Sequence, residues 1–151
     1  MAFAQRRQRI FDDLLDLWST GATISPGTNA LGRDSAGVAL SYDTGGGYTE
    51  GMLVIDVATC AVAVAASGKK FDLVLEGSEV STFATIIPLA LVELGDAYAI
   101  KASGAQVTVG RYIVPFCNDF AGTIYRYLRM YCTTAGTSVT GIEFLAFLSK
   151  L

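Results

Sequence analysis

Hydrophobic and polar residues alternate with a period of two in several segments of the chain. In residues 70–76, Phe71, Leu73 and Leu75 alternate with mostly charged neighbours, and residues 127–132 repeat the pattern. This period is typical of a strand with one buried side and one side that faces solvent. The pattern therefore predicts two half-buried strands in the second half of the chain.

Further β-branched and aromatic runs are separated by glycine-containing turns, and they cover residues 52–58, 60–66, 85–94, 107–116 and 142–148. No helical pattern of ten or more residues lies between these runs, which excludes a doubly wound parallel sheet. We therefore predict an all-β fold, an antiparallel β-sandwich or jelly roll of about eight strands. Pro88 and Pro115 lie inside such runs, so we expect them on edge strands or at bulges.

The amino-terminal region has a different pattern. In residues 10–18, Phe11, Leu14, Leu15 and Trp18 follow helical spacing with aspartates between them, which predicts a short amphipathic helix. This helix would either cover the core of its own domain or dock as an arm on a neighbouring subunit. Both arrangements bury the indole ring.

The segment 19–51 is rich in Gly, Ser and Thr, and includes three consecutive glycines at 45–47. Long irregular segments of this kind are usually functional or lie on a partner. We expect a single domain, in which residues 1–50 form an irregular arm and loop segment on a β-sandwich core of residues 51–151.

The composition narrows the classes of function and partner that fit this chain. The chain has 151 residues, 52% of them hydrophobic and 17% charged, with a formal net charge of −3. A net charge of −3 does not suit a nucleic-acid partner, and the low fraction of charged residues indicates an exterior partly covered by protein partners.

Apolar runs are shorter than the ~20 residues of a membrane helix, and acidic residues interrupt any signal-peptide core. We expect the three cysteines, none of them in C-x-x-C spacing, to be buried thiols in a reducing cytoplasm.

Candidate chemistry is sparse. The chain has no histidine, which removes Ser-His-Asp and Cys-His catalysis and imidazole metal ligands. Glu76 and Glu79 flank a Gly-Ser turn, and we interpret them as a solvated loop rather than as an acid and base pair. Asp34, Asp43, Glu50 and Asp119 lack the spacing of a calcium loop. We expect no catalytic residue, no cofactor and no metal.

The strand at residues 125–131 carries the most distinctive side chains. Tyr127, Arg129 and Tyr131 share one of its faces, and Tyr and Arg are enriched at the centres of protein interfaces. Alternatively, the tyrosines pack at the sheet edge with the arginine stems lying across them. A glycan platform is a third possibility for the same face.

Several of these segments together resemble the small jelly-roll cement, or decoration, proteins of tailed-bacteriophage capsids. The resemblance runs through the strand 71–76, Gly77 to Phe83, residues 107–109 and 114–115, the strand 127–131, and the turn 134–141 before the last strand 142–148. It covers about residues 50–149, and more loosely residues 14–31. The glycine-rich insertion at residues 43–47 departs from the family pattern.

The resemblance implies a non-enzymatic homotrimer on the outer surface of the virion, made in the host cytoplasm, whose partners are copies of itself and the major capsid protein. It implies capsid contacts in the amino-terminal arm and loops, at Phe11, Leu14, Trp18, Asn29, Arg33 and Tyr48. We assign the trimer interface to Tyr127, Arg129, Tyr131, Phe144 and Phe147. The alternative function is a receptor- or glycan-binding module of a phage fibre or spike.

Overall fold

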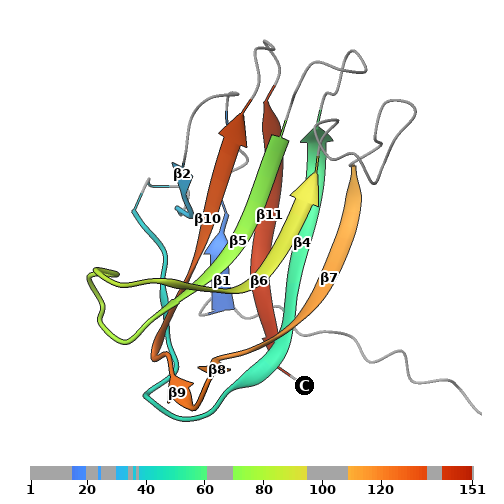
Figure 1. The fold of residues 1–151 in the computed structure, drawn as a ribbon. Helices are drawn as coiled ribbons and strands as arrows, with labels where there is room; N and C mark the ends of the chain where they lie inside the picture. Colours follow the sequence, from blue (N-terminus) through green and yellow to red (C-terminus); the bar gives the residue numbers. More distant parts are fainter. Residues whose placement is uncertain are drawn as a thin grey trace, which may run out of the picture.

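The computed structural model describes residues 15–19, 24, 30–33, 36, 38–60, 70–94, 109–135 and 141–150. Within these residues the chain forms two antiparallel sheets packed face to face (Figure 1). Sheet A has the order β1 (Asp16–Trp18), β11 (Ile142–Lys150), β4 (Glu50–Cys60) and β7 (Gly110–Cys117). Sheet B has the order β2 (Ala30–Leu31), β10 (Tyr127–Ala135), β5 (Lys70–Ser78) and β6 (Ile87–Leu94), and β3 (Tyr42–Asp43) also pairs with β10. A small hairpin of β8 (Asp119–Phe120) and β9 (Thr123–Ile124) lies at one end of the sandwich (Figure 1).

The connections identify the sandwich as a jelly roll. Apart from the β5–β6 pair, the chain changes sheets at each step along the eight strands that make the two sheet orders. It runs from β4 in sheet A to β5 in sheet B, and from β6 in sheet B to β7 in sheet A. This interleaving is the double Greek-key arrangement of a jelly roll. The predicted fold class is therefore confirmed.

The core lies between the sheets and follows the predicted period of two. Phe71, Leu73 and Leu75 on β5 have no exposed surface, and Leu128 and Met130 on β10 are equally buried. The inner face of sheet A adds the side chains of Leu53, Ile55, Phe144, Ala146 and Leu148. Two apolar faces that pack together in this way supply the main stabilisation of the sandwich.

Both prolines occupy the positions expected of them. Pro88 lies on β6 and Pro115 on β7, the terminal strands of sheets B and A among the described residues. Pro88 also sits where the β5–β6 register shifts, between Leu75 and Glu76. Proline has no backbone N–H, and a central strand is hydrogen-bonded to a neighbour on each side. Edge strands and bulges accommodate proline because the missing N–H is not needed there.

The amino-terminal residues correct one prediction. Only residues 15–18 of the predicted helix 10–18 are described, and Asp16–Trp18 form the edge strand β1 instead. This segment pairs with β11 through Asp16 opposite Phe147 and Trp18 opposite Ala146, with a register shift between the two pairs. Pairing with β11 satisfies backbone groups that a short helix would leave open, and the shift lets Leu17 and Trp18 both turn inward. The helical prediction is therefore wrong for Asp16–Trp18.

Gly32 fixes how the residue 30–33 segment packs beside β1. Its N–H donates to the carbonyl of Met130 at 3.0 Å, and its own carbonyl accepts from the N–H of Leu40 at 2.9 Å. A Cβ at this position would overlap the carbonyl oxygen of Leu17. The close approach of two backbones therefore requires glycine here. Together, β1, β2 and β3 show that part of the expected arm contributes strands to both sheets.

Candidate functional surfaces

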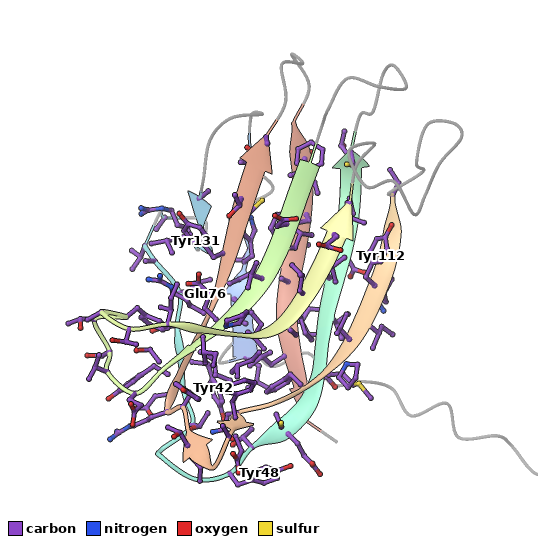
Figure 2. All side chains as sticks on the ribbon, viewed as in Figure 1. Tyr42, Tyr48, Glu76, Tyr112 and Tyr131 are labelled. Carbon is purple, nitrogen blue, oxygen red and sulfur yellow. The ribbon has the colours of Figure 1, made fainter. Side chains whose placement is uncertain are left out.

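A largely buried ion pair lies on the outer face of sheet B. Arg129 on β10 stands directly opposite Glu76 on β5, and its Nε donates to Glu76 Oε2 at 2.7 Å. The two side chains are only 20% and 7% exposed. Figure 2 labels Glu76, which lies beside the chain segment that crosses this face. A charge pair this shielded is unusual on an outer sheet face, where long charged side chains normally reach water.

The shielding comes partly from the connection between β5 and β6, residues 79–86. Figure 1 shows this segment, in yellow-green, extending past β10 and returning across it. The ring centroid of Phe83 lies 4.3 Å from the guanidinium carbon of Arg129, which is close enough for a cation–π contact. Phe83 has a φ of 53°, a left-handed conformation that is strained for a side chain of this size. Its N–H donates to the carbonyl of Val80 at 3.0 Å, which closes the turn that holds the ring.

A hollow of about 240 Å³ opens beside this ion pair. Its walls come from three segments that are far apart in the sequence, namely residues 31 and 39–41, residues 81–83, and β10. The lining side chains are Leu31, Ala39, Leu40, Ser41, Ser81, Thr82, Phe83 and Arg129. The hollow therefore combines one cation and one aromatic ring with three hydroxyl groups and an aliphatic wall.

The structure corrects the prediction for Glu76. Glu79 is exposed as expected, but Glu76 has only 5% of its surface exposed and belongs to a strand. The prediction that both lie in a solvated loop is therefore wrong for Glu76. Only the pairing register of β5 with β10 places this carboxylate opposite Arg129, and the sequence does not state that register.

The predicted interface residues do not form one surface. Tyr127, Arg129 and Tyr131 share the outer face of sheet B, and both tyrosines are half-buried. Phe144 is in the core with no exposed surface, and its ring centroid lies 4.5 Å from that of Trp18. Phe147 lies on the outer face of sheet A, 9% exposed. Because the two outer faces point in opposite directions, these five residues do not share one surface of the protomer (Figure 1).

Arginines lie over both tyrosines on sheet B. The guanidinium carbon of Arg126 is 5.1 Å from the ring centroid of Tyr127, and that of Arg129 is 5.8 Å from the ring of Tyr131. This matches the alternative in which arginine stems cover the tyrosines, although β10 lies inside the sheet rather than at its edge.

The outer face of sheet A is apolar across three neighbouring strands. The outward side chains of these strands include Met52, Val54, Ile113, Pro115, Leu145 and Phe147, and we call this set the apolar face. Phe147, Val54 and Ile113 form one cross-strand row, since the first pairs with the second and the second with the third. Leu145 and Ile113 are each 44% exposed, whereas Val54 has no exposed surface and Phe147 is only 9% exposed.

An exposed ion pair borders the apolar face. Arg111 on β7 stands opposite Asp56 on β4 and donates from Nε and Nη2 to its two carboxylate oxygens, both at 2.6 Å. The hydrogen bond to this carboxylate, more than its charge alone, raises the pKa of the Arg111 guanidinium. The pair marks where the apolar face becomes polar.

The predicted capsid contacts are only partly described. Phe11, Leu14 and Asn29 lie outside the described residues. Trp18 is 2% exposed and packs in the core, so its side chain is not available on the surface. Arg33 and Tyr48 are exposed. The Tyr48 hydroxyl, near the hairpin end in Figure 2, donates to Glu50 Oε2 at 2.7 Å, and this bond chiefly raises the pKa of Tyr48 to about 12.

A fully buried Asn118 holds the loops at this end together. Its Nδ2 donates to the carbonyls of Gly47 and Tyr125 at 2.9 and 3.2 Å, and its Oδ1 accepts from the N–H of Thr49 at 2.7 Å. One side chain thus satisfies three backbone groups that no strand pairs. Sequence analysis missed this residue because a lone Asn in a loop carries no pattern.

The cysteines are all free thiols. Cys60 and Cys132 are buried, as predicted, whereas Cys117 is half-buried. Burial of the thiol raises the pKa of Cys132 to about 12, which makes it a poor nucleophile.

Among the described residues, no three Cys, Asp or Glu side chains gather into a group that could hold a metal ion. In the same part of the chain there is no helix long and apolar enough to cross a membrane. Comparison with protein families and with curated protein sequences finds no match to this chain.

Proposed function

We propose that this protein is a structural component of a tailed-bacteriophage head. In this proposal it binds the outer surface of the capsid as a homotrimer and clamps neighbouring major capsid subunits, without enzymatic activity or a cofactor. The resemblance of residues 50–149 to capsid cement proteins supports it, and the jelly-roll fold is the fold that this resemblance implies. The protein would be made in the host cytoplasm and retained on the virion.

The apolar face of sheet A carries the proposal. The outer face of an antiparallel sheet that meets water is normally polar, because alternation sends apolar side chains inward. Here the outward positions of β11, β4 and β7 are apolar at their centre, and the strands are directly paired. Val54 and Phe147 are buried, and the exposed part of this face, at Leu145 and Ile113, supports the assignment because clustered exposed apolar side chains occur at protein interfaces.

We place the contact between copies on the apolar face. Phe147, one of the predicted interface residues, lies on this face, whereas Phe144 is inside the core and Arg129 lies on the outer face of the other sheet. The exposed Arg33 and Tyr48 lie outside the apolar face, and in this proposal they belong to the surface that contacts the capsid. A trimer that uses separate surfaces for itself and for the shell gains strength from several simultaneous contacts.

Two matched leucine variants test this arrangement. Leu145 lies on the apolar face of sheet A and is 44% exposed, and Leu91 lies on β6 of sheet B and is 46% exposed. We expect Leu145→Glu to lower the sedimentation coefficient from that of a trimer to that of a monomer, because a carboxylate would be buried in the contact between copies. Leu91→Glu should remain trimeric.

Circular dichroism should show the same β-sheet signal in both variants. If both variants stay trimeric, or if both dissociate, the proposed contact between copies on the apolar face is contradicted. A wild-type chain that is already monomeric would contradict the trimer itself.

A further inference from the structure

The guanidinium of Arg129 uses less of its hydrogen-bonding capacity than the guanidiniums of the other ion pairs. Arg111 and Arg126 each donate from Nε and Nη2 to both oxygens of their carboxylate partners, at 2.6 Å and at 2.8 and 2.9 Å respectively. Among the described residues, Arg129 donates a single hydrogen bond, from Nε to Glu76. Its Nη1 and Nη2, which carry four N–H donors, are therefore left for another acceptor.

These two nitrogens are accessible rather than trapped. In the described part of the chain, the one buried side-chain nitrogen or oxygen without a partner is Nε1 of Trp18. Nη1 and Nη2 of Arg129 therefore reach solvent, although the whole side chain is only 20% exposed. Arg129 is also one of the residues that line the hollow on sheet B, and we infer that the hollow is where these donors meet a ligand.

The arginine is also held in place before any ligand arrives. Glu76 fixes Nε at 2.7 Å, and the strained Phe83 places its ring 4.3 Å from the guanidinium carbon. Strain that persists in a turn is often linked to function. A guanidinium already fixed loses little conformational entropy when it binds, and its planar fork matches a carboxylate.

The remaining walls suit the rest of an acidic side chain. Leu31, Ala39 and Leu40 provide an aliphatic surface for methylene groups, and Ser81 and Thr82 add hydroxyl donors. We propose that this hollow binds the carboxylate of a Glu or Asp side chain presented by a protein partner. Glu76 offsets the charge of Arg129, so short-range hydrogen bonds rather than long-range attraction would provide the specificity. This site does not depend on the proposed trimer.

The test titrates the full chain with N-acetylglutamate α-amide and follows the Nε–Hε signal of Arg129 by NMR. The matched neutral probe is N-acetylglutamine α-amide, and glucuronate represents a sugar acid. We expect a saturable shift with the glutamate probe, with a dissociation constant on the order of 1–10 mM for so small a ligand, and none with the glutamine probe.

Two neighbouring variants locate the effect. Ser81 lines the hollow and Val80 does not, and both are exposed in the same turn. Ser81→Trp should weaken binding of the glutamate probe at least about tenfold by filling the hollow, whereas Val80→Trp should change it less than about twofold. Amide spectra that superimpose outside the turn confirm that both variants fold.

Three results would overturn the inference. The first is the absence of a saturable shift, and the second is equal binding of the glutamine probe or equal loss in both variants. The third is tighter, Ser81-dependent binding of glucuronate, which would assign the hollow to sugar acids instead of a protein partner.

Discussion

Replacing Arg129 with methionine should strongly destabilise the protein. The Arg129→Met substitution keeps much of the aliphatic stem but leaves the Glu76 carboxylate, whose side chain is 7% exposed, without its cation. Breaking a buried pair by removing one partner typically costs about 3–5 kcal/mol, because the remaining charge stays desolvated. The lost stacking on Phe83 adds to this loss.

Arg111→Met provides the matched control. Arg111 and Asp56 are also directly opposite each other on paired strands, but their side chains are 57% and 33% exposed. Solvent screens such a pair, so its removal should cost at most about 1 kcal/mol. The double variant Glu76→Gln/Arg129→Met removes the orphaned charge and should recover most of the stability lost by Arg129→Met alone.

Urea unfolding followed by Trp18 fluorescence measures these differences, since this indole is packed in the core next to Phe144. Protein concentration must be the same for all variants, because self-association shifts apparent stability. Equal losses for Arg129→Met and Arg111→Met would refute the reasoning. Failure of Glu76→Gln to rescue Arg129→Met would show that packing rather than charge dominates at this site.

Three further predictions follow from single positions. Asn118→Ala should lower the free energy of unfolding by about 3 kcal/mol, since three backbone groups lose their partner, and urea unfolding would measure it. Gly32→Ala should give little folded protein in a solubility and circular dichroism assay, because its Cβ overlaps the Leu17 carbonyl; normal yield and melting would contradict this. In the folded protein at pH 8, iodoacetamide should leave Cys132 unmodified, since its thiol stays protonated, while mass spectrometry finds Cys117 modified first.

The fold was largely predictable because the burial of one strand face produces an alternating hydrophobic pattern in the sequence. Phe71, Leu73 and Leu75 alternate because a strand sends successive side chains to opposite faces, and the structure buries all three. Pro88 and Pro115 could be assigned to edges because their missing N–H excludes a central strand. Local chemistry was sufficient for these predictions.

Features that depend on long-range pairing were not predictable in the same way. Asp16–Trp18 follow helical spacing but pair as a strand, because β11 offers an edge that is distant in sequence. Glu76 became part of a site only through the β5–β10 register and the folding of residues 79–86 across sheet B. The hollow likewise needs three distant segments to meet.

The apolar face of sheet A did leave a signal that was available in the sequence. Residues 142–148 and 52–57 are nearly continuous hydrophobic runs rather than clean alternations. Continuous runs are typical of strands covered on both faces. In this sandwich sheet B covers the inner face, and on the outer face Val54 and Phe147 are buried whereas Leu145 and Ile113 are exposed.

Sedimentation equilibrium of the full chain tests the central claim most directly, because it gives the mass without any assumption about shape. The account predicts the mass of three chains at micromolar concentration in reducing buffer, unchanged on dilution. A mass of one chain over the same range would contradict the homotrimer and the assignment of the apolar face of sheet A to contact between copies.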